Sequence, residues 1–181
     1  LYTRMWAQAV KTVRDLRGVE IKDEDIELTR EMGLLFDPIT VELPLDIAIP
    51  DSYVNDRATR IKLYRRIASV HDSVKLDLLR DEFGDRFGPI PEPLGNLFFQ
   101  IEVKILAERI GLTAVVKENV SIVLKSPPLP NGVESRGLND LGAGIRAGKN
   151  AYWLTGLDFS GDGWRESVLA RMQKISAARS G

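Results

Sequence analysis

The sequence predicts an α+β fold: three consecutive helices packed on a small mixed or antiparallel sheet, with a C-terminal helix. An extended, alternating segment at residues 40–49 precedes three amphipathic segments between residues 56 and 110. Extended segments at 113–124 and 151–159 follow, and residues 164–178 return to helical spacing. Because strands and helices come in blocks and do not alternate regularly, the pattern favours α+β over α/β.

Composition narrows the function classes before any motif is considered. The chain has 181 residues, and its 25 Lys and Arg balance 26 Asp and Glu, so no overall positive charge attracts it to nucleic acid. It has no cysteine, which excludes disulfides, thiolate metal sites and cysteine nucleophiles. No apolar run approaches the ~20 residues of a membrane span, and no signal peptide is recognisable. We expect a cytoplasmic protein without a membrane partner.

The chain divides into three predicted parts. Residues 1–18 have helical spacing and end at Gly18, and residues 19–38 form an acidic, irregular linker that ends at Asp37-Pro38. Residues 39–181 form the main domain. Because the sequence begins at Leu1, inside a predicted helix, we expect it to be a piece of a longer chain.

The edge strand and the helices of the main domain follow from local signals. Pro44 places the extended segment 40–49 at a sheet edge or a bulge. The first helix covers about Asp56–Val70, and Asp72 or Ser73 caps the second. The third, about Leu94–Ile110, has apolar residues on two sides, so we expect it at the centre of the core, closed by Gly111.

The second helix and the connector after it, residues 79–94, are the stretch around which the domain is organised. One stripe of this helix is apolar and should face the core, namely Leu76, Leu79, Phe83 and Phe87. Gly88 can take the left-handed conformation that ends a helix, and Pro93 suits the first turn of the next. Glu82, Asp85 and Arg86 lie on a separate arc with Leu78 between them, which is either solvated surface or a docking face.

The last third of the chain predicts a hairpin, a short helix, a strand and a final helix. Residues 113–124 alternate around a turn near Glu118-Asn119. Residues 138–147 form a possible short helix, although their glycines oppose it. Residues 151–159 are extended, and residues 164–178 are helical with Val168, Leu169, Met172 and Ile175 facing inward.

Catalytic and metal-binding motifs are not recognisable. Residues 144–150 only superficially resemble a phosphate loop, because Ala143 and Asn150 stand where that motif needs Gly and Ser or Thr. His71 is the single histidine, so no histidine metal cage or Ser-His-Asp triad can form within the chain. We therefore predict no catalytic, cofactor or metal residues.

Two charged clusters leave alternatives open. Asp81, Glu82 and Asp85 could be acids of a small enzyme, but their surface position favours helix ion pairs such as Glu82–Arg86. Lys62, Arg65 and Arg66 share one helix face and could contact nucleic acid, although no aromatic residues are interleaved. A domain that contacts a different protein in trans is a third alternative.

Several blocks of the chain resemble the C-terminal domain of bacterial transcription-repair coupling factor. They are residues 42–53 (Glu-Leu-Pro-Leu-Asp-Ile-Ala-Ile-Pro-Asp-Ser-Tyr), 60–68 (Arg-Ile-Lys-Leu-Tyr-Arg-Arg-Ile-Ala), 79–93 (Leu-Arg-Asp-Glu-Phe-Gly-Asp-Arg-Phe-Gly-Pro-Ile-Pro-Glu-Pro) and 106–112 (Leu-Ala-Glu-Arg-Ile-Gly-Leu). They occur in the family's order and spacing. Residues 1–17 are similar to the tail of the translocase module that precedes this domain.

The resemblance implies a non-catalytic, regulatory domain. The full-length family protein is an ATP-dependent, helicase-like DNA translocase that displaces stalled RNA polymerase and recruits nucleotide excision repair through UvrA. ATP and Mg bind elsewhere in that protein, so no cofactor is expected here. The C-terminal domain packs on the N-terminal UvrB-like module of the same chain, covers the UvrA-binding surface and restrains the motor, an autoinhibition.

The resemblance also implies which residues make this contact. The family uses a Glu-x-x-Asp-Arg set just before Phe-Gly, which matches Glu82, Asp85 and Arg86 here, and Leu78 lies at the centre of the same face. Gly84 is a departure, because the family usually carries a larger apolar residue there. A glycine inside a helix lowers its stability by up to ~1 kcal/mol relative to alanine.

Overall fold

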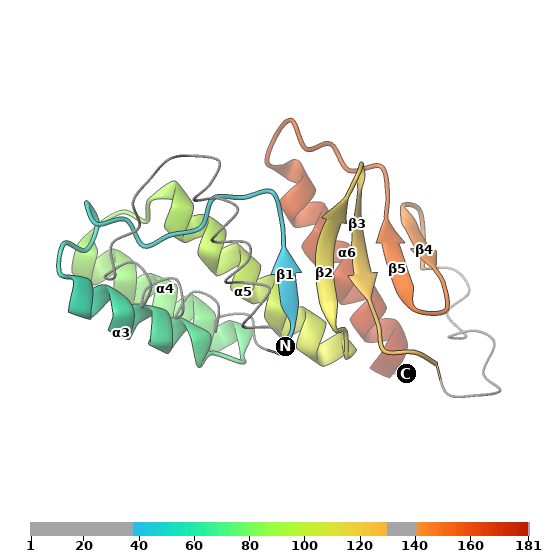
Figure 1. Cartoon of the computed structure of the whole chain (residues 1–181), viewed down its shortest axis with the longest axis horizontal. Coiled ribbons are helices and arrows are strands. Elements are labelled where there is room, and N and C mark those ends of the chain that lie inside the picture. The colour runs from blue at the N-terminus through green and yellow to red at the C-terminus, as the bar shows by residue number, and fades with distance from the viewer. Residues whose placement is uncertain (1–37, 130–140, 181) are drawn as a thin grey trace, which may run out of the picture.

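The fold is described from a computed structural model that places residues 38–129 and 141–180. Its elements are β1 (Thr40–Glu42), α3 (Arg57–Ala68), α4 (Ser73–Phe87), α5 (Glu92–Ile110), β2 (Ala114–Glu118), β3 (Ser121–Lys125), β4 (Ile145–Ala147), β5 (Ala151–Leu154) and α6 (Gly163–Ser180) (Figure 1). The predicted helix at 1–18 and all but the last residue of the predicted linker at 19–38 lie outside the described residues.

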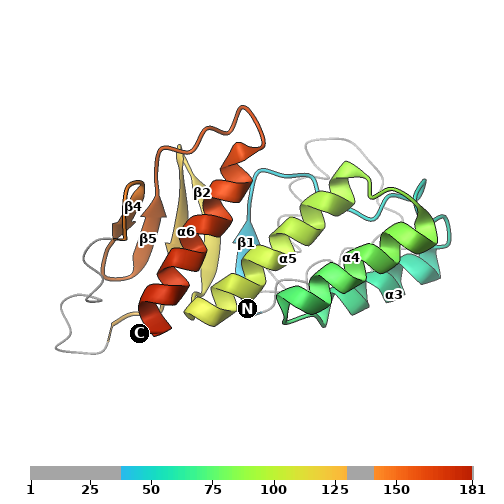
Figure 2. The ribbon, with the colours of Figure 1, turned by 180° about the vertical axis from the view of Figure 1, so that it is seen from behind.

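The sheet is mixed and lies at one end of the molecule. Its strand order is β1-β2-β3-β5-β4, with β1 parallel to β2 and every other pair antiparallel. Helices α5 and α6 cover one face of it, and α3 and α4 pack beside α5 at the other end of the molecule (Figures 1 and 2). The predicted α+β fold, with three helices, a small mixed sheet and a final helix, is confirmed.

Helix α5 is the centre of the core, as its two apolar stripes predict. Both stripes are buried: Leu94, Leu97, Phe98, Ile101 and Ile105, and Phe99, Val103, Leu106 and Ile110. Phe98 of the first stripe contacts Phe83 of α4, and Phe99 of the second contacts Trp164 of α6. Gly111 ends the helix in the left-handed conformation (φ 75°, ψ 41°). A single apolar cluster therefore joins α3, α4, α5, α6 and the sheet.

Three local predictions need correction. The extended segment 40–49 forms a strand only at Thr40–Glu42, because Pro44, which lacks an N–H, lies two residues beyond its end. The place of this strand at the sheet edge is confirmed. Gly88 has a positive φ of 92° but a ψ of −168°, so it is not left-handed helical. The described part of the predicted helix 138–147 contains β4, since Gly142 and Gly144 adopt positive φ angles that a helix does not allow.

The remaining boundaries follow the sequence more closely. The hairpin of β2 and β3 turns at Asn119, whose φ is 52°. Strand β5 ends at Leu154, earlier than the predicted 159, and Gly156 (φ 67°) follows. Helix α6 begins at Gly163, and its inward residues Val168, Met172 and Ile175 are fully buried, whereas Leu169 is half-buried. No helix in the described part of the chain combines the length and apolar character needed to span a membrane.

A buried hydrogen bond joins the edge segment to the helices. The backbone N–H of Ile49 donates to the hydroxyl oxygen of Tyr64 at 2.6 Å, and both residues are buried. Tyr64→Phe is expected to lower the free energy of unfolding by about 1–3 kcal/mol, because it leaves this N–H unsatisfied. Urea denaturation would measure the loss, and an unchanged stability would contradict the importance of this bond.

Candidate docking surface

Helix α4 is fixed in place at both ends by side chains. At its N-terminus the carboxylate of Asp72 accepts a hydrogen bond from the backbone N–H of Lys75 at 3.1 Å, which confirms Asp72 as the cap. At its C-terminus the Tyr53 hydroxyl lies 2.9 Å from the carbonyl oxygens of both Phe83 and Gly88 and can donate to either. Burial raises the pKa of Tyr53, so this hydroxyl stays protonated as a donor.

The inner side of α4 belongs to the core. Leu76, Leu79 and Phe83 are buried, and Phe87 is half-buried. The Phe83 ring makes edge contacts with the rings of Phe87 and Phe98, with centroids 6.0 and 5.6 Å apart. The predicted core stripe is therefore confirmed, and it fixes which side of α4 faces outward.

The outer side of α4 exposes apolar and acidic groups together. Leu78 is 64% exposed and Val74, one turn earlier, is 67% exposed; they are two of three large apolar side chains this exposed among the described residues. Asp81 and Asp85 are exposed on the same side. The structure leaves Asp85 without a hydrogen bond or ion pair to any described residue. An apolar pair flanked by free carboxylates suits a partner surface that carries both apolar and basic groups.

Glu82 is the centre of an ion-pair network that joins α4 to α3. Both carboxylate oxygens accept hydrogen bonds from the Arg66 guanidinium, at 2.7 and 2.6 Å. The Arg86 guanidinium also donates to Glu82, at 3.0 Å, which confirms the predicted Glu82–Arg86 pair. The Arg86 guanidinium further lies over the Phe87 ring, 5.1 Å from its centroid. We define the outer surface of α4 as Leu78, Glu82, Asp85 and Arg86 and call it the α4 face.

This network changes the roles within the α4 face. Three of the acceptor positions of Glu82 are occupied inside the domain, so Glu82 positions two guanidiniums rather than offering a free carboxylate. The α4 face therefore presents Asp85 as its free acid and Arg86 as its oriented cation, both about two turns after Leu78.

The same pair removes Arg66 from the alternative basic face. The interpretation of Lys62, Arg65 and Arg66 as three cations available to phosphates does not fit, because Arg66 makes a bidentate pair with Glu82. Pairing with Glu82 also raises the pKa of Arg66. Arg65 has interactions of its own within the chain. Nothing in this arrangement favours nucleic acid over a protein partner.

The two arginines strongly perturb the acidity of Glu82. Hydrogen bonds from Arg66 and then from Arg86 lower the pKa of Glu82 from 4.5 to about 2. The folded domain thus binds fewer protons at Glu82 than the unfolded chain does between these two values. The resulting stabilisation is complete above about pH 4.5 and is lost as the pH falls towards 2.

Glu82→Gln tests this dependence on pH. The variant is expected to be less stable than the parent above about pH 4.5, and the difference should shrink progressively towards about pH 2. Urea denaturation of both proteins across this range measures it. A stability difference that does not change with pH would show that the Glu82 carboxylate is not held by the two arginines.

The described residues do not assemble the other chemistry that the sequence left open. No group of three potential metal ligands occurs among them. Asp81, Glu82 and Asp85 do not form a buried acid pair, because the Glu82 carboxylate binds Arg66 and Arg86 and the other two side chains are exposed. His71 is exposed and lies 3.2 Å from Glu108, as a surface histidine would. Residues 144–150 form a strand and a turn and not the start of a helix.

Comparison with known proteins decides the family. The TRCF domain family matches residues 43–131, which include α3, α4, α5 and the β2–β3 hairpin. The chain contains a TRCF domain. The α4 face lies wholly within the matched part of this TRCF domain.

Relatives of the TRCF domain are transcription-repair-coupling factors. Those of Mycobacterium tuberculosis, Rickettsia prowazekii and Staphylococcus haemolyticus are 27%, 36% and 26% identical over 137, 107 and 175 residues, which is 75%, 51% and 88% of this chain. The same regions cover 11%, 10% and 14% of these relatives, so the chain spans about a tenth of their length.

A solved structure shares the fold of the TRCF domain. A crystal structure of the C-terminal domain of transcription-repair coupling factor superposes with a TM-score of 0.58 and 19% identity. The match covers 78% of this chain and 96% of that one. The similarity extends well beyond residues 43–131, so the sheet and α6 complete the same fold.

Sequence reasoning missed two features of the outer side of α4. The Arg66–Glu82 pair joins residues 16 positions apart. The sequence pattern assigned Arg66 to a basic face of one helix and Glu82 to a separate face of the next. Val74 was not assigned to the exposed side, although it lies four residues before Leu78. The signal for Val74 was present, since residues four apart share one side of a helix.

Proposed function

We propose that this chain is the C-terminal regulatory domain of a transcription-repair coupling factor and that its α4 face docks on the N-terminal UvrB-like module of the same protein. The closed contact covers the UvrA-binding surface and restrains the ATP-driven translocase during nucleotide excision repair. The observation that carries the proposal is the α4 face, where the exposed Leu78 lies on the same side of the helix as the free carboxylate of Asp85 and the oriented guanidinium of Arg86, about two turns before them.

Preorganisation supports this use of the surface. Arg86 is held by Glu82 and by the Phe87 ring, and Glu82 is held by Arg66, so docking orders few new side chains. Because few side chains lose freedom on docking, the entropic cost is small, and more of the contact free energy remains as binding free energy. Asp85 then meets an arginine of the partner module, and Arg86 meets a carboxylate or a carbonyl oxygen.

A modest docking free energy is suited to a regulatory contact that must open and close. Exposed ion pairs contribute ~0–1 kcal/mol each, and a cluster around an apolar centre contributes more. In the proposal both modules belong to one chain, so the effective concentration of each for the other is high. Individually weak interactions can therefore keep the domain docked most of the time. A marginally closed state opens readily when a competing partner binds.

Charge reversal in a full-length protein that carries this domain tests the proposal. The double variant Glu82→Arg with Asp85→Arg is expected to raise both UvrA binding and basal ATPase activity, because it repels the basic groups of the partner module. Pull-down with UvrA and a coupled ATPase assay measure the two effects. Glu166→Arg, an exposed substitution on α6, serves as the control and should change neither.

The two readouts separate docking from folding. Thermal melting must show that the double variant remains folded, because Glu82→Arg also leaves Arg66 without its partner. If a folded double variant binds UvrA and hydrolyses ATP like the parent protein, the docking proposal is wrong.

A further inference from the structure

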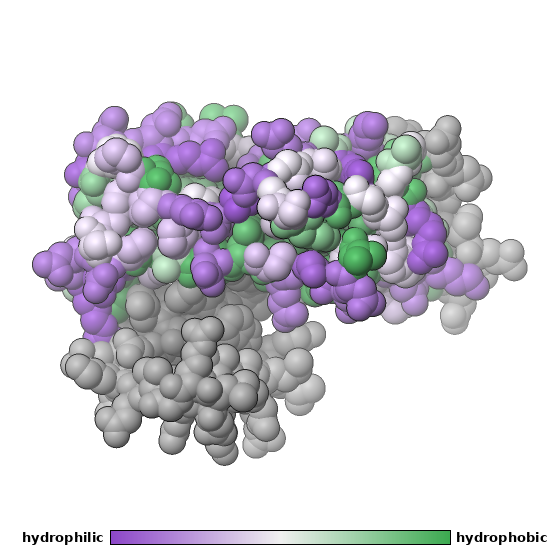
Figure 3. Space-filling model, turned by 90° about the horizontal axis from the view of Figure 1, so that it is seen from above, coloured by the Kyte–Doolittle hydropathy of each residue, from purple (hydrophilic) through white to green (hydrophobic). Residues whose placement is uncertain are grey.

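A pocket lies away from the α4 face, between the segment after β1 and the starts of α5 and α6. Its volume is about 460 Å³, within the range typical of ligand sites. Pro44, Leu45 and Asp46 form one side, Glu92, Pro93 and Asn96 the second, and residues 159–162, 164 and 165 the third. Seen from above, hydrophobic residues show between hydrophilic ones along the middle of the molecule (Figure 3).

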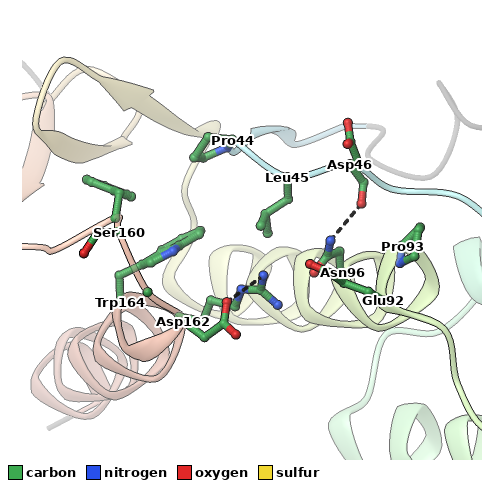
Figure 4. Close-up of a pocket in the computed structure, with 12 residues that line it drawn as sticks. Pro44, Leu45, Asp46, Glu92, Pro93, Asn96, Ser160, Asp162 and Trp164 are labelled. Atoms are coloured by element: carbon green, nitrogen blue, oxygen red, sulfur yellow. Dashed lines mark hydrogen bonds and ion pairs between the residues drawn. The ribbon is translucent and has the colours of Figure 1, made fainter.

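Two buried polar atoms at the pocket have no hydrogen-bond partner in the described part of the chain. Asn96 is only 4% exposed; its Nδ2 donates to the backbone oxygen of Asp46 at 2.9 Å, but its Oδ1 has no hydrogen-bond partner among the residues that the structure describes. The side chain faces the space between Leu45, Asp162 and Trp164 (Figure 4). Arg165 pairs with Asp162 at 3.1 Å through Nη2, while its Nε is also buried and unpartnered. Buried polar groups are rarely left unsatisfied, so an acceptor and a donor here point to a ligand or bound water.

The walls and the rim define what else a ligand meets. Trp164 is buried and is held by ring contacts with Phe99 and Phe159, at 5.7 and 5.2 Å between centroids. Leu45 adds a half-buried apolar surface on the other side. The rim carries three carboxylates, from Asp46, Glu92 and Asp162, against the single guanidinium of Arg165. The pocket is therefore acidic, which disfavours phosphates and nucleic acid.

We propose that this pocket binds a peptide segment that inserts a primary carboxamide side chain, Gln or Asn, flanked by basic residues. A carboxamide carries both groups that the pocket lacks: its NH2 donates to Asn96 Oδ1, and its oxygen accepts from the Arg165 Nε–H. Its methylene groups pack between Leu45 and Trp164. Basic flanking residues meet the carboxylates of Asp46 and Glu92 at the rim.

A carboxamide that makes both hydrogen bonds satisfies the two buried atoms, Asn96 Oδ1 and Arg165 Nε, that the described residues leave without a partner. This site and the α4 face lie on different elements, so they can be occupied independently.

Titration of the 15N-labelled chain with short peptides tests the proposal by NMR. The probe is acetyl-Lys-Gln-Lys-amide, and saturable shifts are expected at the Asn96 side-chain amide and the Trp164 indole. Two control peptides separate the two recognition elements. Lys-Leu-Lys lacks the side-chain carboxamide and should bind about threefold to tenfold more weakly. Glu-Gln-Glu reverses the flanking charge and should bind several-fold more weakly.

Two variants assign the binding to the pocket. Asn96→Leu removes the acceptor and should erase the preference for Gln over Leu in the probe. Glu92→Lys leaves the buried groups in place, is exposed, and should erase the preference for basic over acidic flanks. Equal binding of all three peptides, shifts confined to residues outside the pocket, or no shift at about 10 mM probe would overturn the proposal.

Discussion

Phe83→Ala is expected to lower the free energy of unfolding by about 3–5 kcal/mol, the largest loss of any single change considered. The Phe83 side chain is fully buried where α4 meets α5, and it contacts the rings of Phe87 and Phe98. Removing it leaves a cavity that two packed helices cannot close. Urea denaturation monitored by circular dichroism measures the effect.

Leu78→Ala is the matched control on the same helix. Leu78 is 64% exposed, so its truncation should change the unfolding free energy by no more than about 0.5 kcal/mol. The two variants together report which side of α4 is the core and which is free. Similar losses for both would contradict the orientation of α4.

Asp85→Arg is expected to weaken docking onto a UvrB-like module by about tenfold, because one attractive contact becomes a repulsive one. Asp85 has no partner among the described residues and is exposed, so the stability of the domain itself should be nearly unchanged. The variant therefore separates docking from folding more cleanly than any change at Glu82. Isothermal titration of the chain with the isolated module measures the affinity, and thermal melting measures the stability.

Glu82→Gln should affect docking in a different way. It frees Arg66 and Arg86 from the network instead of removing a contact with the partner. We expect a smaller loss of affinity than for Asp85→Arg, together with a loss of stability at neutral pH. If Glu82→Gln weakens docking more than Asp85→Arg does, then Glu82 contacts the partner directly and the roles assigned within the α4 face are wrong.

Local signals predicted the helices well because their ends depend on single residues. Asp56 and Asp72 accept backbone hydrogen bonds at the starts of α3 and α4, and Gly111 takes the left-handed conformation that ends α5. The two apolar stripes of α5 correctly placed it at the centre of the core. These features depend on neighbours within a few positions, which a sequence displays directly.

Contacts between residues far apart in the sequence could not be predicted from these local signals. The Glu82–Arg66 pair depends on how α3 packs on α4, and the helical periodicity of each gives no information about their relative rotation. The pocket joins segments around residues 45, 96 and 162 that share no motif. Strand β4 was predicted as helix because its pairing with β5, and not its own short sequence, stabilises it.

The most direct test of the docking proposal is the affinity of this chain for an isolated UvrB-like module, measured by titration with the parent chain, Asp85→Arg and Leu78→Ala. We predict saturable binding of the parent, about tenfold weaker binding of Asp85→Arg and weaker binding of Leu78→Ala, with all three proteins equally folded. Absence of binding by the parent, or equal affinities for all three, would show that the α4 face is not the docking surface.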